Sequence, residues 1–155
     1  MQKSVNYVIM AANKELYILD ASVILKWFLP ETEDHENASK VRSDYLSSDI
    51  VATIPHYAYA EIMNILKNKL SREEALSAFS FLLMYTLKDY PITLELASVA
   101  VELMEKFPGV SFYDAGYHAL ALQHGGTFIT ADKKYYEKTK KRGHIMLLKQ
   151  YGKKR

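Results

Sequence analysis

The segment Leu16-Tyr-Ile-Leu-Asp20-Ala-Ser22-Val-Ile-Leu-Lys-Trp-Phe28 decides the fold. Four apolar or aromatic residues precede a single carboxylate at Asp20, and a second apolar run follows it. This pattern predicts a buried β-strand over 16–20 and then a short helix to Phe28, with Ser22 as its N-cap. Ligands of open α/β sheets bind at the carboxyl ends of the strands, so Asp20 stands where a functional site is expected.

The composition is that of one globular domain. The chain has 155 residues, of which 49% are hydrophobic and 25% are charged. It has no cysteine, which excludes disulfides and thiolate metal sites. No apolar run reaches the roughly 18 residues that span a membrane, and the N-terminus lacks a secretory pattern. We therefore expect a cytoplasmic protein with an N-terminal extension (1–14), a single domain (15–150) and a basic C-terminal tail (151–155).

Basic residues are concentrated near the C-terminus. Ten of the twenty Lys and Arg residues lie from Lys133 onward, where Glu137 is the one acid. The preceding residues carry ten basic and seventeen acidic side chains, a net charge of −7. An acidic body with a basic end suggests a polyanionic partner. The alternative is a solvated C-terminus that only keeps the protein soluble.

Predicted strands alternate with predicted helices along the chain. This order implies a parallel sheet with helices on both faces, and a helical arm formed by the long stretch 55–89. A capping box, Ser71-Arg-Glu-Glu74, marks one helix start, and Pro55 is expected to open another helix. The other predicted strands are 49–54, 90–94, 127–130 and an edge strand at 144–148, and the other predicted helices are 35–48, 55–70, 72–86, 94–106, 111–125 and 132–141.

Four acidic residues interrupt this apolar pattern: Asp20, Glu61, Asp114 and Asp132. Each has an ordinary explanation, such as a turn residue, a surface carboxylate beside an apolar helix face, or a helix N-terminus. However, Asp20 and Asp132 follow strands of one parallel sheet, and the helix start that carries Asp114 can face the same edge. Gathered carboxylates repel one another unless a cation neutralises them, and oxygen ligands suit Mg²⁺ or Mn²⁺. Such a site can activate water for phosphodiester hydrolysis.

Four short motifs carry a resemblance to a known family. Leu19-Asp20-Ala-Ser22, Pro55 with Glu61 and Asn64, Tyr113-Asp114-Ala115 and Ile129-Thr130-Ala-Asp132 together resemble PIN-domain proteins, especially VapC-type toxins. The resemblance implies a three-layer α/β/α fold with a central, mostly parallel sheet, and a ribonuclease that depends on Mg²⁺ or Mn²⁺. It also implies a homodimer and a cognate antitoxin protein. The implied metal-binding and catalytic acids are Asp20, Glu61, Asp114 and Asp132, with Ser22 and Thr130 as supporting hydroxyls and Asn64 beside them.

Several other side chains have an expected role. His118 is expected to be a buried, hydrogen-bonded histidine rather than a ligand, because hard oxygen sites do not need imidazole. Trp27 and Phe28 are expected to pack in the core or at a dimer contact rather than to stack on bases. Contacts with the RNA backbone are expected from Lys133, Lys134, Lys138, Lys140, Lys141 and Arg142.

Other functions remain open at this stage. A housekeeping RNA-processing nuclease would carry the same acids as a toxin. A catalytically silent PIN scaffold could bind RNA or a protein without cleaving anything. A phosphoacceptor receiver domain also places an aspartate at a strand end, but it needs paired acids after the first strand, and Asp20 stands alone there.

Overall fold

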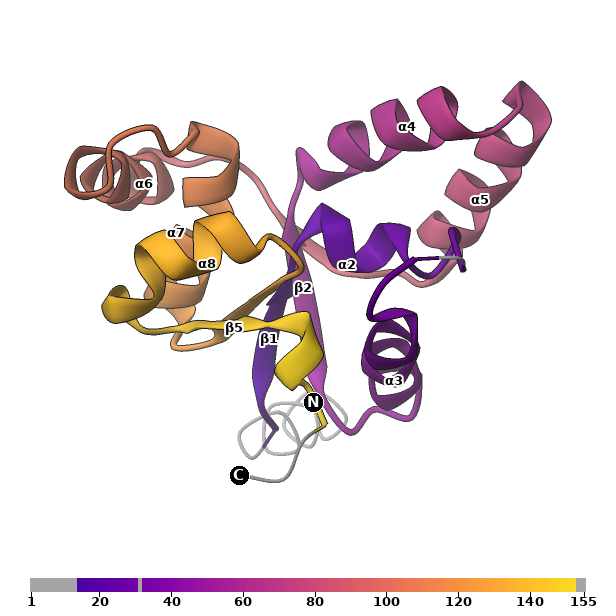
Figure 1. Ribbon diagram of the computed structural model, residues 1–155, viewed down its shortest axis with the longest axis horizontal. Helices are drawn as coiled ribbons and strands as arrows, with labels where there is room; N and C mark the ends of the chain where they lie inside the picture. The colour runs from indigo at the N-terminus through magenta and orange to yellow at the C-terminus, as the bar shows by residue number, and fades with distance from the viewer. Residues whose placement is uncertain (1–13, 31, 153–155) are drawn as a thin grey trace, which may run out of the picture.

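A five-stranded parallel sheet forms the centre of the protein (Figure 1). The computed structural model describes residues 14–30 and 32–152. The strand order is β3-β2-β1-β4-β5, and every neighbouring pair is parallel, so β1 lies in the middle. The strands are β1 (Leu16–Leu19), β2 (Val51–Pro55), β3 (Lys88–Tyr90), β4 (Thr127–Thr130) and β5 (Ile145–Leu147).

Helices cover both faces of the sheet, which confirms the predicted three-layer α/β/α fold. Figure 1 shows α6 and α7 on one side of the central strands, and α2, α3, α4 and α5 on the other. Parallel strands need such crossover connections. The helices are α2 (Ala21–Leu25), α3 (His35–Leu46), α4 (Ala58–Lys69), α5 (Arg72–Met84), α6 (Leu94–Lys106), α7 (Phe112–His124) and α8 (Lys133–Thr139), with 3-10 turns η1 (Lys140–Arg142) and η2 (Leu148–Gln150).

The core surrounds the central strand. Ile18 and Leu19 on β1 are fully buried, and burying each such side chain contributes about 1.5–3 kcal/mol. Helix α4 buries Ala58, Ile62 and Leu66, which lie four residues apart on one face. Helices α4 and α5 form the projecting arm seen in Figure 1, as predicted. No helix among residues 14–30 and 32–152 is long and apolar enough to cross a membrane.

Several predicted helix starts are confirmed. Ser71 and Glu74 form the expected reciprocal capping box of α5. The side chain of Ser111 caps α7, which ends at Gly125 in the left-handed conformation that glycine adopts readily. The predicted helix 94–106 has the bounds of α6.

Two predicted helix starts are wrong. Helix α2 begins at Ala21, so Ser22 lies inside it and is not its N-cap; its hydroxyl instead bonds with neighbouring elements, as described below. Pro55 does not open a helix but ends β2, pairing with Tyr90 in register, and α4 begins at Ala58. A proline is tolerated there because the β1–β2 register ends at Thr53, so pairing with β1 does not need an amide hydrogen at position 55.

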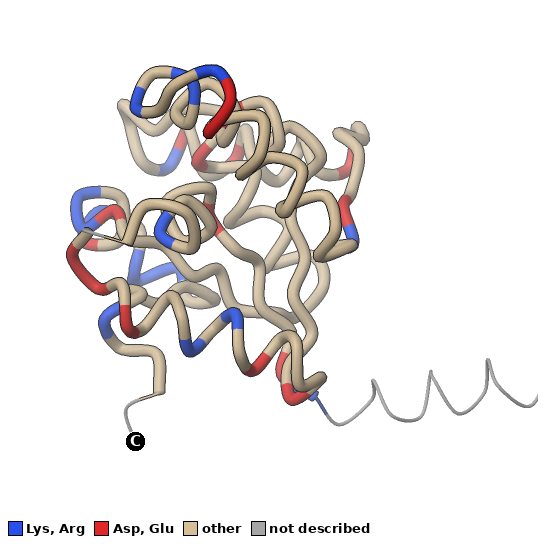
Figure 2. The backbone as a smooth tube through the Cα atoms, turned by 90° about the vertical axis from the view of Figure 1, so that its right-hand side faces the viewer, with Lys and Arg blue, Asp and Glu red and all other residues tan. Residues whose placement is uncertain are grey.

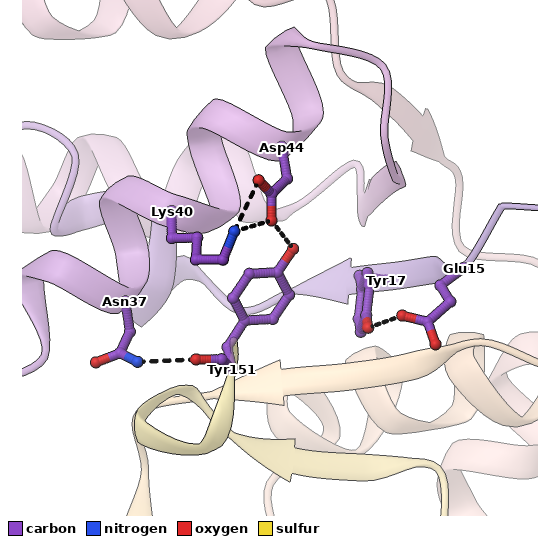
Figure 3. Close-up of polar contacts among 6 residues, drawn as sticks. All are labelled: Glu15, Tyr17, Asn37, Lys40, Asp44 and Tyr151. Atoms are coloured by element: carbon purple, nitrogen blue, oxygen red, sulfur yellow. Dashed lines mark hydrogen bonds and ion pairs between the residues drawn. The ribbon is translucent and has the colours of Figure 1, made fainter. Parts of the chain in front are cut away.

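The C-terminal end of the described chain is anchored on α3 (Figure 3). The hydroxyl of Tyr151 donates to Asp44 at 2.8 Å, and Asn37 donates to the carbonyl of Tyr151 at 3.0 Å. Lys40 pairs with the same Asp44 carboxylate at 3.1 Å. Tyr151 is buried, so the folded core reaches at least this first residue of the expected tail. Of the expected N-terminal extension, only Lys14 lies among the described residues.

Candidate active site

Asp20 lies at the carboxyl edge of the sheet, where β1 ends. Its backbone amide donates to the carbonyl of Ile129 on β4 at 3.0 Å, which extends the ladder by one residue. Because Leu19 pairs with Ile129 in register, Asp20 lies level with Thr130. Thr130 is fully buried, and its hydroxyl donates to Oδ2 of Asp20. The pairing of two central strands therefore sets the position of the aspartate.

Two hydroxyl groups hold the Asp20 carboxylate in place. Ser22 Oγ donates to the same Oδ2 atom at 2.9 Å and accepts from the amide of Ala131 at 3.1 Å. Thr130 Oγ1 accepts from the amide of Asp132 at 3.0 Å. Each hydroxyl thus donates to Asp20 and accepts from the turn that follows β4. These bonds fix the direction of the proton in each hydroxyl and leave Oδ1 of Asp20 without a hydrogen bond from either of them.

The charges of three predicted acids act on one another at this edge. Burial raises the pKa of Asp20 to about 6, the Thr130 and Ser22 hydrogen bonds oppose this rise, and the negative charge of Asp114 adds to it. Burial also raises the pKa of Glu61; the Tyr117 hydrogen bond opposes the rise, and the charges of Asp20 and Asp114 add to it. All three side chains are partly buried. Three elements, β1, α4 and α7, thus bring their carboxylates close enough to interact.

Tyrosine side chains pack among these acids. Tyr117 is buried in α7 and donates to Oε2 of Glu61 at 2.6 Å, which holds that carboxylate. Tyr57 packs edge-to-face on Tyr117, with ring centroids 5.5 Å apart, and donates to the carbonyl of Tyr113 at 2.6 Å. Burial and the charges of Asp20 and Glu61 raise the pKa values of both phenols, so these phenols stay protonated donors.

Gly116 makes room for Tyr57. A Cβ atom at position 116 would lie 2.3 Å from the Tyr57 hydroxyl oxygen, which is too close for any real contact. Our sequence interpretation assigned no role to Tyr57, Tyr117 or Gly116. The helical spacing held a signal: Tyr57 precedes Glu61 by four residues, and Tyr117 follows Asp114 by three, so each tyrosine lies one turn from an acid.

Asp132 lies at the outer side of the same edge. It is exposed, and its Oδ1 accepts from the amide of Tyr135 at 2.9 Å, so it caps α8. Burial raises the pKa of Tyr135, and the charges of Asp114, Asp20 and Asp132 add to this rise. Asp114 also has a structural bond, because Ser111 Oγ donates to its Oδ2 at 2.8 Å. Asp114 therefore supports a helix start and also acts on Asp20 and Glu61, whereas the contact that Asp132 makes is the cap of α8.

The described residues do not form a closed metal cage. Within residues 14–30 and 32–152, no group of three or more Asp, Glu, His or Cys side chains lies close enough together to hold one ion. Asn64 is exposed on α4, one turn after Glu61. The site is thus an open set of partly buried carboxylates.

The predicted RNA-binding residues are all exposed, but they differ in their contacts. Lys133 forms an ion pair with Glu33 at 2.9 Å, Lys138 donates to the carbonyl of Pro108 at 2.9 Å, and Lys140 pairs with Glu137. Lys133 and Lys134 begin α8 directly after Asp132, beside the carboxylates. Because β5 runs parallel to β4, the chain must return to the opposite edge before β5 starts. Lys140, Lys141 and Arg142, in η1, therefore lie away from the carboxylates.

His118 is a structural residue, as expected. It is fully buried; its Nε2 donates to the carbonyl of Gly143 at 2.7 Å, and its Nδ1 accepts from the Tyr135 hydroxyl at 3.1 Å. Burial lowers its pKa, so the ring is neutral. Trp27 is also buried, and its indole NH donates to the carbonyl of Ala38 at 2.9 Å.

Comparison with known proteins adds to this geometry. VapC20 of Mycobacterium tuberculosis, described as a toxin that cleaves the sarcin-ricin loop, superposes with a TM-score of 0.62 at 18% identity, covering 78% of this chain and 93% of its own. A toxin-antitoxin complex from Klebsiella pneumoniae has a TM-score of 0.62 at 16% identity, covering 85% and 97%. FitAcB of Neisseria gonorrhoeae has a TM-score of 0.63 at 17% identity, covering 84% and 95%.

The sequence itself settles the family. No curated protein matches it at a significant level. The family model described as the PIN domain matches residues 17–141, most of the chain. That range begins in β1 and contains all four predicted acids. The protein is a member of the PIN-domain family.

Proposed function

We propose that this protein is a divalent-metal-dependent endoribonuclease and the toxin of a toxin-antitoxin pair. The observation that carries the proposal is the mutual effect of the Asp20, Glu61 and Asp114 charges at the carboxyl edge. Partly buried like charges destabilise the fold unless a ligand neutralises them, so their presence at one edge of the sheet favours a functional role. A phosphoacceptor receiver domain offers no role for Glu61 on α4.

The donor set fits a hard divalent cation. The carboxylates of Asp20, Glu61 and Asp114 are oxygen ligands, and Mg²⁺ keeps several of its waters and needs only one or two carboxylates. Since no three such side chains among the described residues lie close enough to hold one ion, water would have to complete the coordination. A bound Mg²⁺ or Mn²⁺ ion would supply Lewis-acid chemistry to a phosphodiester and lower the pKa of an attacking water.

The residues of the site have separate roles in this proposal. Ser22 and Thr130 hold Asp20 in one orientation by donating to Oδ2, so Oδ1 faces the ligand. Tyr117 holds Glu61 by the same kind of bond. Asp132 closes the outer side, and Lys134, at the start of α8, contacts the phosphate next to the scissile bond. The chain thereby orients the strand against the carboxylates, and fixed orientation lowers the barrier to hydrolysis.

Protein partners are part of the same proposal. Large apolar side chains are exposed on α5 and at the start of α6, among them Phe81 at 57%, Met84 at 72% and Leu94 at 83%. Exposed apolar groups of this size favour protein contacts over an isolated monomer. The similar structure solved as a toxin-antitoxin complex supports an antitoxin partner for this chain, and we assign the exposed apolar side chains to contacts with that partner or with a second copy of the chain.

The direct test is cleavage of structured RNAs by purified protein freed of any co-purified partner, with and without Mg²⁺ or Mn²⁺. We expect metal-dependent cleavage by the unmodified protein and none by Asp20→Asn. Asp49→Asn makes the same chemical change at an exposed position outside the site and should cleave normally. Metal-dependent cleavage retained by Asp20→Asn would contradict the assignment of Asp20 to the active site. RNA binding without cleavage by the unmodified protein would indicate the silent scaffold instead.

A further inference from the structure

A cavity of about 380 Å³ lies between α6, the end of α7 and η1. Its lining includes the apolar side chains of Val99, Leu103 and Leu122. Three cations line it, Lys106 on α6 and Lys141 and Arg142 on η1, together with one acid, Glu102. Among the described residues none of the three cations forms a salt bridge, and neither does Glu102. The cavity therefore presents a net charge of +2 beside apolar surface.

This cavity is separate from the carboxylate edge, by which we mean the carboxyl end of the sheet where Asp20, Glu61 and Asp114 lie. Leu122 lies eight residues after Asp114 on α7, which corresponds to about 12 Å along a helix axis. Lys141 and Arg142 lie on the far side of α8 from Asp132, where the chain turns back toward β5. The cations in the cavity are thus too far away to serve the phosphate at the reacting bond.

The composition of the cavity fits a nucleotide better than a simple anion. Lys and Arg bind phosphate oxygens, and the apolar side chains among them can contact a ribose or a base. An acidic peptide would use the charges but has no group that combines a phosphate with a flat apolar face. The side of the molecule that Figure 2 faces has basic and acidic residues interspersed along α3, and basic residues gathered where α4 meets α5, which is the region used for the control variant below.

We infer that this cavity is a second binding site for the RNA strand, which it holds at a nucleotide distant from the bond to be cleaved. The inference rests on the proposed nuclease function. A strand that enters the cavity and also crosses the carboxylate edge would be held at two points. Two-point attachment raises the affinity for long substrates without changing the contacts at the reacting bond.

Binding of two labelled oligouridines tests this inference. A length of about 5 nucleotides lies near the lower end of the single-strand site sizes of about 4–16 nucleotides known for OB folds, and a length of about 20 nucleotides exceeds the upper end. Fluorescence anisotropy is measured on the Asp20→Asn protein, which cannot consume the probe under the proposed function. The added variant is Lys141→Ala/Arg142→Ala, and the matched control is Lys67→Ala/Lys69→Ala, which removes two exposed cations from the end of α4.

We expect the cavity variant to reduce the ratio of long-probe to short-probe affinity about 10-fold and the control to leave this ratio unchanged. The salt slope for the long probe should decrease by about 1.4, since each lost single-strand phosphate contact removes about 0.7. An unchanged ratio in the cavity variant, or an equal decrease in the control, overturns this inference and leaves the nuclease proposal intact. Failure of both probes to bind contradicts the nuclease proposal and the inference together. Thermal melting of each variant confirms that it is folded.

Discussion

The carboxylate edge around Asp20 and the basic segment from Lys133 to Arg142 contrast in how they are built. Asp20 is held by two hydroxyls from the ends of central elements, and those hydroxyls are held by backbone amides. The lysines of the basic segment are exposed, and three of them already bond with Glu33, Pro108 or Glu137. Strand pairing thus fixes the position of the Asp20 carboxylate, whereas the basic segment offers positive charge on side chains with little fixed geometry.

The contrast predicts that the largest effects on activity arise at the carboxylate edge. Replacing Asp114 by Asn removes one of the interacting charges, and we expect kcat to fall at least about 100-fold, as for other fixed electrostatic groups. Asp132→Asn should have a smaller effect, because Asp132 is exposed and an Asn can still cap α8. Single-turnover cleavage measures both. If Asp132→Asn proves more harmful than Asp114→Asn, the ranking of the acids is wrong.

Gly116 offers a test of the packing behind the acids. Gly116→Ala would push its Cβ into the Tyr57 hydroxyl, and overpacking of this kind costs about 1–3 kcal/mol. We expect a lower free energy of unfolding in urea, together with weaker cleavage. The double change Gly116→Ala/Tyr57→Phe removes the blocking oxygen and should recover part of the lost stability. No recovery would contradict the proposed contact.

The raised pKa of Asp20 predicts how stability depends on pH without metal. The folded state holds this proton up to about pH 6, whereas the unfolded chain releases it near its ordinary value of 3.8. The folded state therefore binds more protons between these values, and the free energy of unfolding falls as pH rises through that window. The raised pKa of Glu61 contributes to the same fall, so Asp20→Asn should reduce the fall and raise the free energy of unfolding at pH 7.5 by up to about 3 kcal/mol.

Urea unfolding in EDTA at pH 4.5 and pH 7.5 measures this effect. Asp49→Asn serves as the control and should keep the behaviour of the unmodified protein. Added Mg²⁺ should stabilise the unmodified protein at pH 7.5 more than at pH 4.5, because protons compete with the cation for the carboxylates. Equal stabilisation at both pH values would argue against binding at these acids.

The smallest effects are expected in the basic segment. Lys134 has no salt bridge among the described residues and lies beside the carboxylates, so Lys134→Ala should lower the salt slope of RNA binding by about 0.7. Lys138→Ala should change the slope less, because its amine bonds with Pro108. Anisotropy titrations over a range of salt concentrations measure both. An equal decrease in salt slope from both variants would mean that the bond to Pro108 does not reduce the contribution of Lys138 to RNA binding.

Much of the fold followed from the sequence because its signals are local. The apolar strand before Asp20, the capping box at Ser71 and the glycine after α7 each depend on a few neighbouring residues. Pro55 misled for the same reason: its preference for a helix start is local, but its pairing with Tyr90 is not. Ser22 likewise bonds with a turn more than 100 residues away.

The site was predictable in part. The four acids break an apolar pattern, so each attracts notice in the sequence. The roles of the tyrosines were not predictable: Tyr117 belongs to the stretch that resembles the third PIN motif, but its bond to Glu61 and its contact with Tyr57 depend on how α4 and α7 pack together. The sequence also did not show that the basic segment is divided between the two ends of the sheet. This division depends on the chain crossing back along the sheet before β5, because β5 runs parallel to β4.

The titration of Asp20 tests the central claim most directly, namely that Asp20, Glu61 and Asp114 form one electrostatic cluster. Carbon-13 NMR of the Asp20 carboxyl group, without metal, should show a pKa of about 6. The value should decrease in Asp114→Asn, the pKa of Glu61 should decrease in Asp20→Asn, and addition of Mg²⁺ should lower the pKa of Asp20 further. A pKa of Asp20 near 3.8 that neither Asp114→Asn nor Mg²⁺ alters would contradict the account.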